Sequence, residues 1–146
     1  MTDTLTAPQD LSQLVAALRS EERAVAHVGI FDLNAYFRER RVRIESLETV
    51  FGEGGTFVNV LPRWDSGEVV YHPGPFVGEA VAIDPGSCRP YPYEDNAVLL
   101  IADYCGPSRS LSPRELLRTQ VRRAADLGFG VRAAFEFEFF VLDESG

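Results

Sequence analysis

Near the start of the chain, apolar and polar positions recur with the period of an α-helix. Asp10 comes directly before this run, where its side chain can accept hydrogen bonds from the free amides of a first helical turn. The pattern therefore predicts a short amphipathic helix over residues 11–19. Its apolar face consists of Leu11, Leu14, Val15 and Leu18.

Two segments rich in β-branched and aromatic residues follow, over residues 24–33 and 36–44. The turn between them contains Asp32 and Asn34, residue types that favour tight turns, so the pattern predicts a β-hairpin. The second arm carries arginine in near alternation, which fits either a solvated strand edge or a basic face that meets an anion. These arginines are Arg38, Arg40, Arg41 and Arg43.

Further along, residues 44–51 predict a short helix, and residues 80–83 and 97–104 predict strands. Because the segment 97–104 is apolar almost throughout, we expect it to be a buried central strand. Segments 84–86 and 89–93 lie between these strands and contain proline, which cannot donate a hydrogen bond to a sheet ladder. We therefore expect both segments to interrupt the sheet.

A strong helix start comes next, with Ser112 at the N-cap, Pro113 at the first helical position and Glu115 at the third. We expect this helix to end near Gly128. Residues 131–142 then alternate with a period of two, which predicts a long strand.

The composition is that of an ordinary globular protein, with 146 residues, 45% of them hydrophobic and 25% charged. This length allows one domain, or one small domain and the beginning of another. No apolar run approaches the roughly 18 residues that span a bilayer, and residues 1–10 are polar and acidic. We therefore expect a cytoplasmic protein without membrane contact, in which Cys88 and Cys105 are free, buried thiols.

The net charge of −8 argues against nucleic acid as a partner. All 14 basic residues are arginine, so the chain offers no lysine for a Walker motif or a Schiff base. His27 and His72 stand in unrelated contexts without the spacing of metal ligands. A histidine-based metal site within the chain is therefore not expected.

The candidate chemistry lies in the last predicted strand. A period of two puts Glu136 and Glu138 on one face, with their Cα atoms about 6.5–7 Å apart. Neighbouring carboxylates repel one another unless water, arginine or a cation lies between them. Mg²⁺ or Mn²⁺ would suit these oxygen ligands, whereas the structural alternative is a half-exposed strand that happens to carry two glutamates.

Three segments together resemble the glutamine synthetase family. Residues 29–34 with Arg38 and Arg40 resemble the family's D-x-N-G-x-x-R-G-K hairpin. Residues 84–93 resemble the segment that leads into its last N-terminal strand, and residues 135–142 are similar to its E-x-E-F-[FY]-L strand. The three matches occur in the family's order and cover nearly the whole chain.

The resemblance implies an α+β fold. A helical segment, residues 1–23, would precede a β-grasp-like domain, residues 24–107. Residues 108–146 would then be the first helix and strand of a catalytic domain. The rest of that catalytic domain would lie outside the chain, so we expect the isolated chain to be inactive.

The resemblance also implies a chemistry: ATP-dependent joining of glutamate to ammonia or an amine through γ-glutamyl phosphate. By the family pattern, Glu138 would bind a Mg²⁺ or Mn²⁺ ion near glutamate, and Glu136 the ion that bridges the ATP phosphates. Relatives are homo-oligomers with active sites between subunits. The side chains that would face such a site in a neighbouring subunit are Asp32, Asn34, Asn59, Trp64 and Asp65.

Several positions depart from the family pattern. Ala35 and Glu39 replace glycines of the hairpin, and Arg40 replaces a lysine. Val58 stands where ammonia-using members carry the aspartate of F-D-G-S-S, which favours the branches that use amines or polyamines. An alternative of another class stays open, in which the chain is a stand-alone, non-catalytic β-grasp interaction module.

Overall fold

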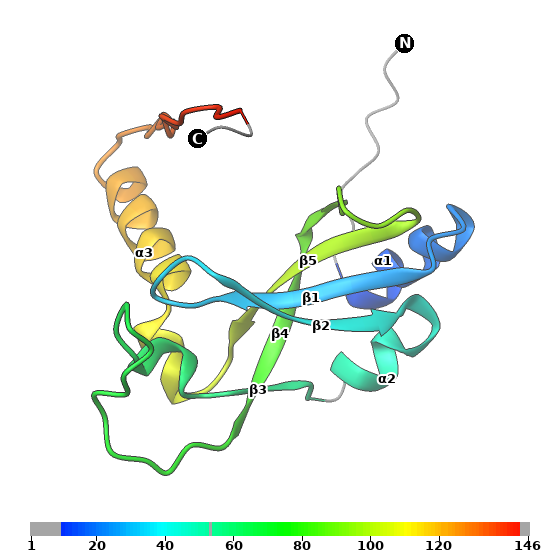
Figure 1. Ribbon diagram of the computed structural model, residues 1–146, viewed down its shortest axis with the longest axis horizontal. Coiled ribbons are helices and arrows are strands. Elements are labelled where there is room, and N and C mark those ends of the chain that lie inside the picture. The colour runs from blue at the N-terminus through cyan, green and yellow to red at the C-terminus, as the bar shows by residue number, and fades with distance from the viewer. Residues whose placement is uncertain (1–9, 53, 144–146) are drawn as a thin grey trace. The chain divides into compact units, whose positions relative to one another are not determined.

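The computed structural model describes residues 10–52 and 54–143 (Figure 1). The chain divides into two compact units, Met1–Leu116 and Leu117–Gly146. The elements in chain order are α1 (Leu11–Ser20), β1 (Val25–Phe31), β2 (Phe37–Arg43), α2 (Leu47–Phe51), β3 (Thr56–Val58), β4 (Gly78–Pro90), β5 (Ala97–Tyr104) and α3 (Pro113–Asp126). Short 3₁₀ turns cover Ile44–Ser46, Leu61–Arg63 and Pro107–Leu111.

The first unit is a five-stranded sheet in the order β2-β1-β5-β4-β3. β1 and β5 pair in parallel, and the other neighbours pair antiparallel. The architecture is therefore α+β, as the sequence predicts. β5 is the central strand, with Leu100 and Ala102 fully buried, which confirms the expectation for residues 97–104.

One face of this sheet carries the hydrophobic core. Alternate residues of β1 and β5 point into it, because side chains along a strand alternate between faces. Both α1 and the helical segment 44–51 pack on this face through the apolar stripes that the sequence predicts. The packed side chains include Leu14, Val15, Leu18, Ala26, Val28, Ile44, Leu47, Phe51, Val98 and Leu100.

The N-cap of α1 and the hairpin of β1 and β2 also form as predicted. The Asp10 side chain accepts a hydrogen bond of 2.8 Å from the backbone N–H of Gln13. The hairpin pairs Val25 with Arg43 and Phe31 with Phe37. Local sequence signals suffice at both places, because each is determined by residues close together in the chain.

β4 is longer than predicted. It continues through residues 84–86, where the sequence predicts a break, by means of an irregularity between Asp84 and Arg89. At this irregularity the Ser87 hydroxyl accepts a hydrogen bond of 2.8 Å from the backbone N–H of Ile101 on β5. A side-chain oxygen thus accepts the hydrogen bond in place of a backbone carbonyl at this irregularity.

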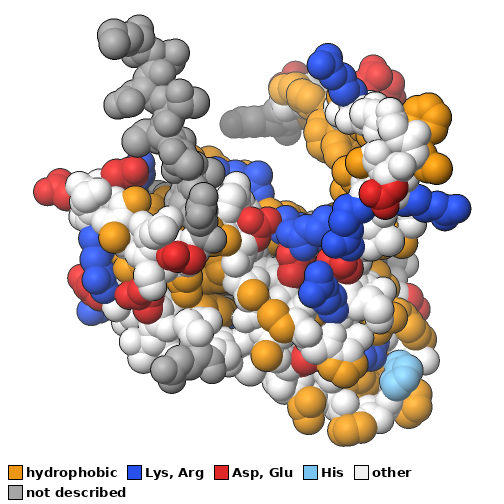
Figure 2. Space-filling view, turned by 180° about the vertical axis from the view of Figure 1, so that it is seen from behind, with side chains coloured by type: hydrophobic (Ala, Val, Ile, Leu, Met, Phe, Trp, Pro, Cys, Tyr) orange, Lys and Arg blue, Asp and Glu red, His pale blue; other side chains and the backbone are white. Residues whose placement is uncertain are grey.

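The arginines of β2 form ion pairs and ring contacts at the edge of the sheet. Arg38 pairs with Glu68, Arg41 pairs with Glu94, and the Arg40 guanidinium lies 5.2 Å from the centroid of the Phe57 ring. On the face shown in Figure 2, blue arginine side chains likewise lie beside red acidic ones. These contacts favour the strand-edge interpretation over a basic face for an external anion.

The two thiols differ from the expectation of buried cysteines. Cys105 is exposed and Cys88 is only partly buried, and neither forms a disulfide. Burial, followed by the nearby Glu21 carboxylate, raises the pKa of the Cys88 thiol above its ordinary value. In the part of the chain that the structure describes, no helix is long and apolar enough to cross a membrane.

In the second unit, the predicted helix end is confirmed. Gly128 has a φ of 83° and its N–H donates 2.9 Å to the carbonyl of Ala125, while the N–H of Phe129 donates 2.9 Å to Ala124. A left-handed glycine of this kind is a common way to end a helix.

The predicted strand over residues 131–142 is wrong for this chain. Residues 129–143 form neither helix nor strand, and Phe135, Phe137 and Phe139 are each at least 78% exposed. A strand needs a neighbour for its backbone groups and a surface for its apolar side, and none of the described residues provides either. The predicted boundaries at residues 23/24 and 107/108 stay predictions.

Candidate functional site

The turn between β1 and β2 is built around the fully buried carboxylate of Asp32. Its Oδ1 accepts hydrogen bonds from the backbone N–H groups of Asn34, at 2.9 Å, and Tyr36, at 3.0 Å. The backbone N–H of Asp32 donates 3.0 Å to the carbonyl of Tyr36, and the N–H of Ala35 donates 3.1 Å to the carbonyl of Asp32. The side chain thus fixes the turn from within.

A second turn, in the loop before β4, repeats this hydrogen-bond pattern. Asp65 Oδ1 accepts from the N–H groups of Gly67, at 2.8 Å, and Val69, at 3.0 Å. The N–H of Asp65 donates to the carbonyl of Val69, and the N–H of Glu68 donates to the carbonyl of Asp65, each at 3.0 Å. Glu68 has a φ of 60°, close to the 62° of Ala35 at the same place in the first turn.

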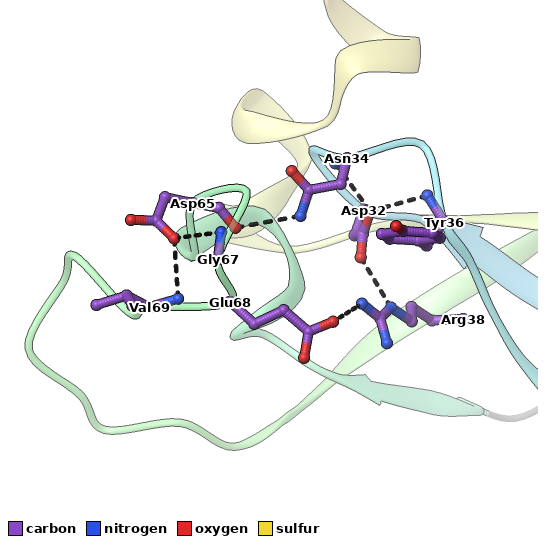
Figure 3. Close-up of polar contacts among 8 residues, drawn as sticks. All are labelled: Asp32, Asn34, Tyr36, Arg38, Asp65, Gly67, Glu68 and Val69. Atoms are coloured by element: carbon purple, nitrogen blue, oxygen red, sulfur yellow. Dashed lines mark hydrogen bonds and ion pairs between the residues drawn. The ribbon is translucent and has the colours of Figure 1, made fainter.

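Direct contacts join the two turns (Figure 3). Asn34 Nδ2 donates 3.1 Å to the backbone carbonyl of Asp65. Arg38 links both turns, because its Nε donates 2.8 Å to Asp32 Oδ2 while its other side forms an ion pair with Glu68. Hydrogen bonds to these two acids raise the pKa of Arg38 above its ordinary value, and the bond to Glu68 has the larger effect.

Aromatic rings complete the assembly, which we call the paired-turn cluster: Asp32, Asn34, Tyr36, Arg38, Trp64, Asp65 and Glu68. The Arg38 guanidinium carbon lies 5.3 Å from the centroid of the Tyr36 ring and 5.0 Å from that of Trp64, both within the range of cation–π attraction. Trp64 Nε1 is buried without a hydrogen-bond partner among the described residues.

Four of the five residues predicted to face a neighbouring active site come together in this cluster, namely Asp32, Asn34, Trp64 and Asp65. Asn59 makes none of these contacts. Its Oδ1 accepts 3.1 Å from the N–H of Val77, so it serves the loop that leads to β4. Whether these residues face an active site stays a prediction.

Sequence reasoning missed Glu68 and the linking role of Arg38. A signal was present, because Asp-Leu-Asn-Ala-Tyr and Asp-Ser-Gly-Glu-Val place aspartate at the same position of two five-residue turns. The cluster contains carboxylates already held by backbone amides or arginine. Its chemistry therefore suits the shaping of a surface more than the transfer of a proton.

Ala35 provides a test of the first turn. A left-handed backbone conformation costs a residue with a Cβ atom about 1–2 kcal/mol, and glycine avoids this cost. Part of the benefit is lost because glycine has greater conformational freedom in the unfolded chain. We expect Ala35→Gly to stabilise the protein by about 1 kcal/mol in urea unfolding. As the matched control, Ala16→Gly on the exposed side of α1 is expected to destabilise it by about 1 kcal/mol. A loss of stability in Ala35→Gly would contradict the assigned backbone.

A second group of polar residues, which we call the His27 cluster, lies on the sheet face away from the core: His27, Glu39, Arg41, Tyr91 and Glu94. His27 is buried on β1, and its Nδ1 and Nε2 lie 2.7 Å from Glu39 Oε1 and 2.9 Å from Glu94 Oε2. Tyr91 stacks on the ring with centroids 3.8 Å apart. The Arg41 Nε donates 3.0 Å to Glu94 Oε2.

Glu94 makes the folding stability of the chain depend on pH in the acidic range. The Arg41 hydrogen bonds first, and His27 second, lower the pKa of Glu94 from 4.5 to about 2. A carboxyl with a lower pKa in the folded state contributes stability that is complete above about pH 4.5 and is lost as pH falls through about 2. We expect Glu94→Gln to remove this part of the acid dependence, measured as urea midpoints from pH 6 to pH 2. An unchanged profile would show that Glu94 is not the group involved.

The predicted metal ligands Glu136 and Glu138 lie in the segment without regular structure. Within residues 10–52 and 54–143, no three side chains of His, Cys, Asp or Glu are gathered so that they could hold a metal ion. The described residues therefore do not form a metal site by themselves. The assignment of the two glutamates as metal ligands stays a prediction.

Comparison with known proteins shows that the chain resembles amine ligases of the glutamine synthetase type, as the sequence predicts. It is 28% identical over 129 residues to a glutamate–isopropylamine ligase from a Pseudomonas species, covering 81% of this chain and 28% of the relative. No family model matches the chain.

Solved structures show the same fold. The ADP complex of GmaS matches with a TM-score of 0.60 and 20% identity, over 78% of this chain and 26% of GmaS. GmaS without ligand matches with a TM-score of 0.60 and 19% identity, over 87% of this chain and 27% of GmaS. The chain thus spans little more than a quarter of the length of each of these relatives.

Proposed function

We propose that the chain is the N-terminal portion of a glutamine synthetase-like ligase that joins glutamate to an amine with ATP through γ-glutamyl phosphate. The observation that carries this proposal is the similarity to a glutamate–isopropylamine ligase over 129 residues, which covers 81% of this chain. The shared fold with GmaS supports it independently of sequence identity. The β-grasp description and the start of a catalytic domain near residue 108 belong to the same proposal.

The paired-turn cluster is our candidate for the surface that this unit contributes to an active site between subunits of a homo-oligomer. Asp32 would shape this surface and not touch substrate, because its carboxylate is buried and bonded to two amides and Arg38. Trp64 and Asp65 lie nearer the surface and are the better candidates for contact.

We infer that the acceptor is a small alkylamine. Val58 occupies the position at which, by the family resemblance, ammonia-using members carry an aspartate, and this residue is 41% exposed. An apolar side chain cannot bind or deprotonate ammonium, but it can contact an alkyl group. The name of the curated relative, which specifies isopropylamine, points the same way.

A divalent ion would supply charge neutralisation for the phosphates and the acyl phosphate. The described residues do not complete a site for it, so no step of the reaction is assigned to this chain through the metal. What the chain contributes in this proposal is the shaped surface around Arg38 and two candidate carboxylates in the segment 129–143.

The proposal is tested on the gene product as its host makes it, captured with an antibody raised against residues 1–146. We expect its mass to exceed 16.2 kDa severalfold and its phosphate release to require ATP, glutamate and an alkylamine together. The purified 146-residue chain, assayed alongside, is expected to release none. A native product that is inactive with ammonia, methylamine, isopropylamine and putrescine alike would overturn the proposed function. A product of 16.2 kDa would favour the stand-alone module.

A further inference from the structure

The chain turns directly after β3, and hydrogen bonds to its backbone carbonyls hold this turn. We call it the Val58 turn, and it consists of Val58, Asn59 and Val60. The Tyr104 hydroxyl on β5 donates 2.6 Å to the carbonyl of Val58. The Arg63 guanidinium donates to the carbonyl of Asn59, and the backbone N–H of Arg63 donates 2.7 Å to the carbonyl of Val60. Each carbonyl of the turn therefore has a donor.

Further contacts fix the Arg63 side chain. Its Nη1 also donates 2.9 Å to the hydroxyl of Ser108, a residue that is fully buried. That hydroxyl donates 2.6 Å to Glu79 Oε2, and the backbone N–H of Ser108 donates 2.7 Å to Glu79 Oε1. Gly106 leaves room for this carboxylate, because a Cβ atom there would lie 2.8 Å from Glu79 Oε1. Glu79 on β4 is thus connected through Ser108 and Arg63 to the Val58 turn.

Tyr104 holds the turn from the core side of the sheet. It is only 2% exposed and belongs to the hydrophobic core. Burial first, and the charge of Glu79 next, raise the pKa of its phenol above the ordinary value, so the hydroxyl keeps its proton and donates. A buried hydroxyl needs a hydrogen-bond partner, which the carbonyl of Val58 supplies.

The sheet ladder gives the turn little additional support. β3 is three residues long and ends at Val58, which pairs with Gly78. Beyond it, Asn59 and Val77 exchange two contacts: the N–H of Asn59 donates 2.9 Å to the carbonyl of Val77, and the N–H of Val77 donates 3.1 Å to Asn59 Oδ1. The position of Val58 at the surface therefore depends on side chains that come from β4, β5 and the 3₁₀ turns.

We propose that Tyr104 and the chain of contacts from Glu79 through Ser108 to Arg63 are positioning residues for the acceptor amine. They hold the Val58 turn so that the Val58 side chain meets the alkyl group. This inference rests on the proposed function, since it takes Val58 as the contact for that group, and it adds that residues without substrate contact determine the fit of the amine. An apolar contact that is already ordered binds a ligand at a lower entropic cost than one that must first be ordered.

The kinetic test uses the native gene product. In Tyr104→Phe we expect the KM for isopropylamine to rise about fivefold, the size of one lost hydrogen bond, with kcat and the KM values for ATP and glutamate unchanged. A merely structural role would instead change all of these constants together. Tyr93→Phe also removes a phenolic hydroxyl, but from a residue that is 86% exposed. As the matched control, it is expected to leave every constant unchanged.

Hydrogen exchange in the 146-residue chain tests the holding of the turn without any assay of activity. We expect the amides of Asn59 and Val77 to exchange roughly tenfold faster in Tyr104→Phe and in Ser108→Ala, because each variant removes a contact that holds the turn. Ser110→Ala, which changes an exposed hydroxyl of the same 3₁₀ turn, is expected to leave both rates unchanged. Should Tyr104→Phe fail to fold, Ser108→Ala takes its place in both experiments.

The outcomes separate this inference from the proposed function. An active native product in which Tyr104→Phe leaves the KM for isopropylamine unchanged would overturn this inference alone. Unchanged exchange of Asn59 and Val77 in both variants would do the same, because the turn would then not depend on these contacts. A native product without amine-dependent phosphate release would overturn the proposed function, and the role in amine fit with it.

Discussion

Replacing Asp32 with alanine is expected to destabilise the first unit by about 3 kcal/mol. The substitution removes the acceptor of two backbone N–H groups, those of Asn34 and Tyr36, and the buried partner of Arg38. Because the Asp32 side chain is fully buried, water cannot readily replace it. The measurement is urea unfolding followed by the fluorescence of Trp64, the single tryptophan of the chain, which lies in the same cluster.

Two further variants separate the contributions within this cluster. Asp65→Ala removes the same pair of backbone contacts from the second turn. Asp65 is exposed, however, and no arginine among the described residues pairs with its side chain, so we expect a cost of about 1 kcal/mol. Asp32→Asn retains an oxygen for the amides while removing the charge that faces Arg38. Equal losses for Asp32→Ala and Asp65→Ala would contradict the central place given to the buried carboxylate.

Much of the first unit could be predicted because its signals are local. The capped start of α1 and the hairpin of β1 and β2 depend on residues within a few positions of one another. The buried central strand was recognisable from its apolar run alone. The same local reasoning placed Asp32 and Asn34 in a turn, which is where they lie.

The contacts between turns could not be predicted in this way. Arg38 and Glu68 are 30 positions apart, and they meet only because the loop before β4 lies beside the hairpin (Figure 3). The pairing of His27 with Glu94, 67 positions away, depends in the same way on the β4–β5 connection. Alternating arginines in a sequence show that a strand has a charged side, but not which acids will meet it.

The segment 131–142 shows the opposite case, in which a strong periodic pattern does not produce the element. Alternation of Phe and Glu makes two distinct faces possible, but a strand is stable only when a neighbouring strand satisfies its backbone groups and another layer covers its apolar face. The exposed side chains of Phe135, Phe137 and Phe139 show that the described residues do not supply that environment. Periodicity reports a preference, and tertiary contacts decide whether it is realised.

The two glutamates of this segment give the prediction with the largest expected effect on activity. If the proposed ligase is correct, Glu136→Gln or Glu138→Gln in the native gene product should lower amine-dependent phosphate release by about 100-fold or more, because each removes a charged oxygen ligand. The amide keeps the size of the side chain, so folding should change little. Glu45→Gln, an exposed acid of the first unit, is the control and should leave activity within about twofold, as surface substitutions generally do.

Metal titration of the same variants tests whether the loss of activity comes from weaker metal binding. In the native product, loss of activity in Glu138→Gln should be accompanied by weaker Mn²⁺ binding, measured by electron paramagnetic resonance. The 146-residue chain should hold Mn²⁺ only weakly, since two carboxylates supply fewer ligands than the roughly six that such an ion takes. Full activity with unchanged Mn²⁺ affinity in both variants would show that Glu136 and Glu138 are not metal ligands. They would then be charged side chains on a segment whose partner is the rest of a folded protein, and the catalytic proposal would have to rest on the paired-turn cluster alone.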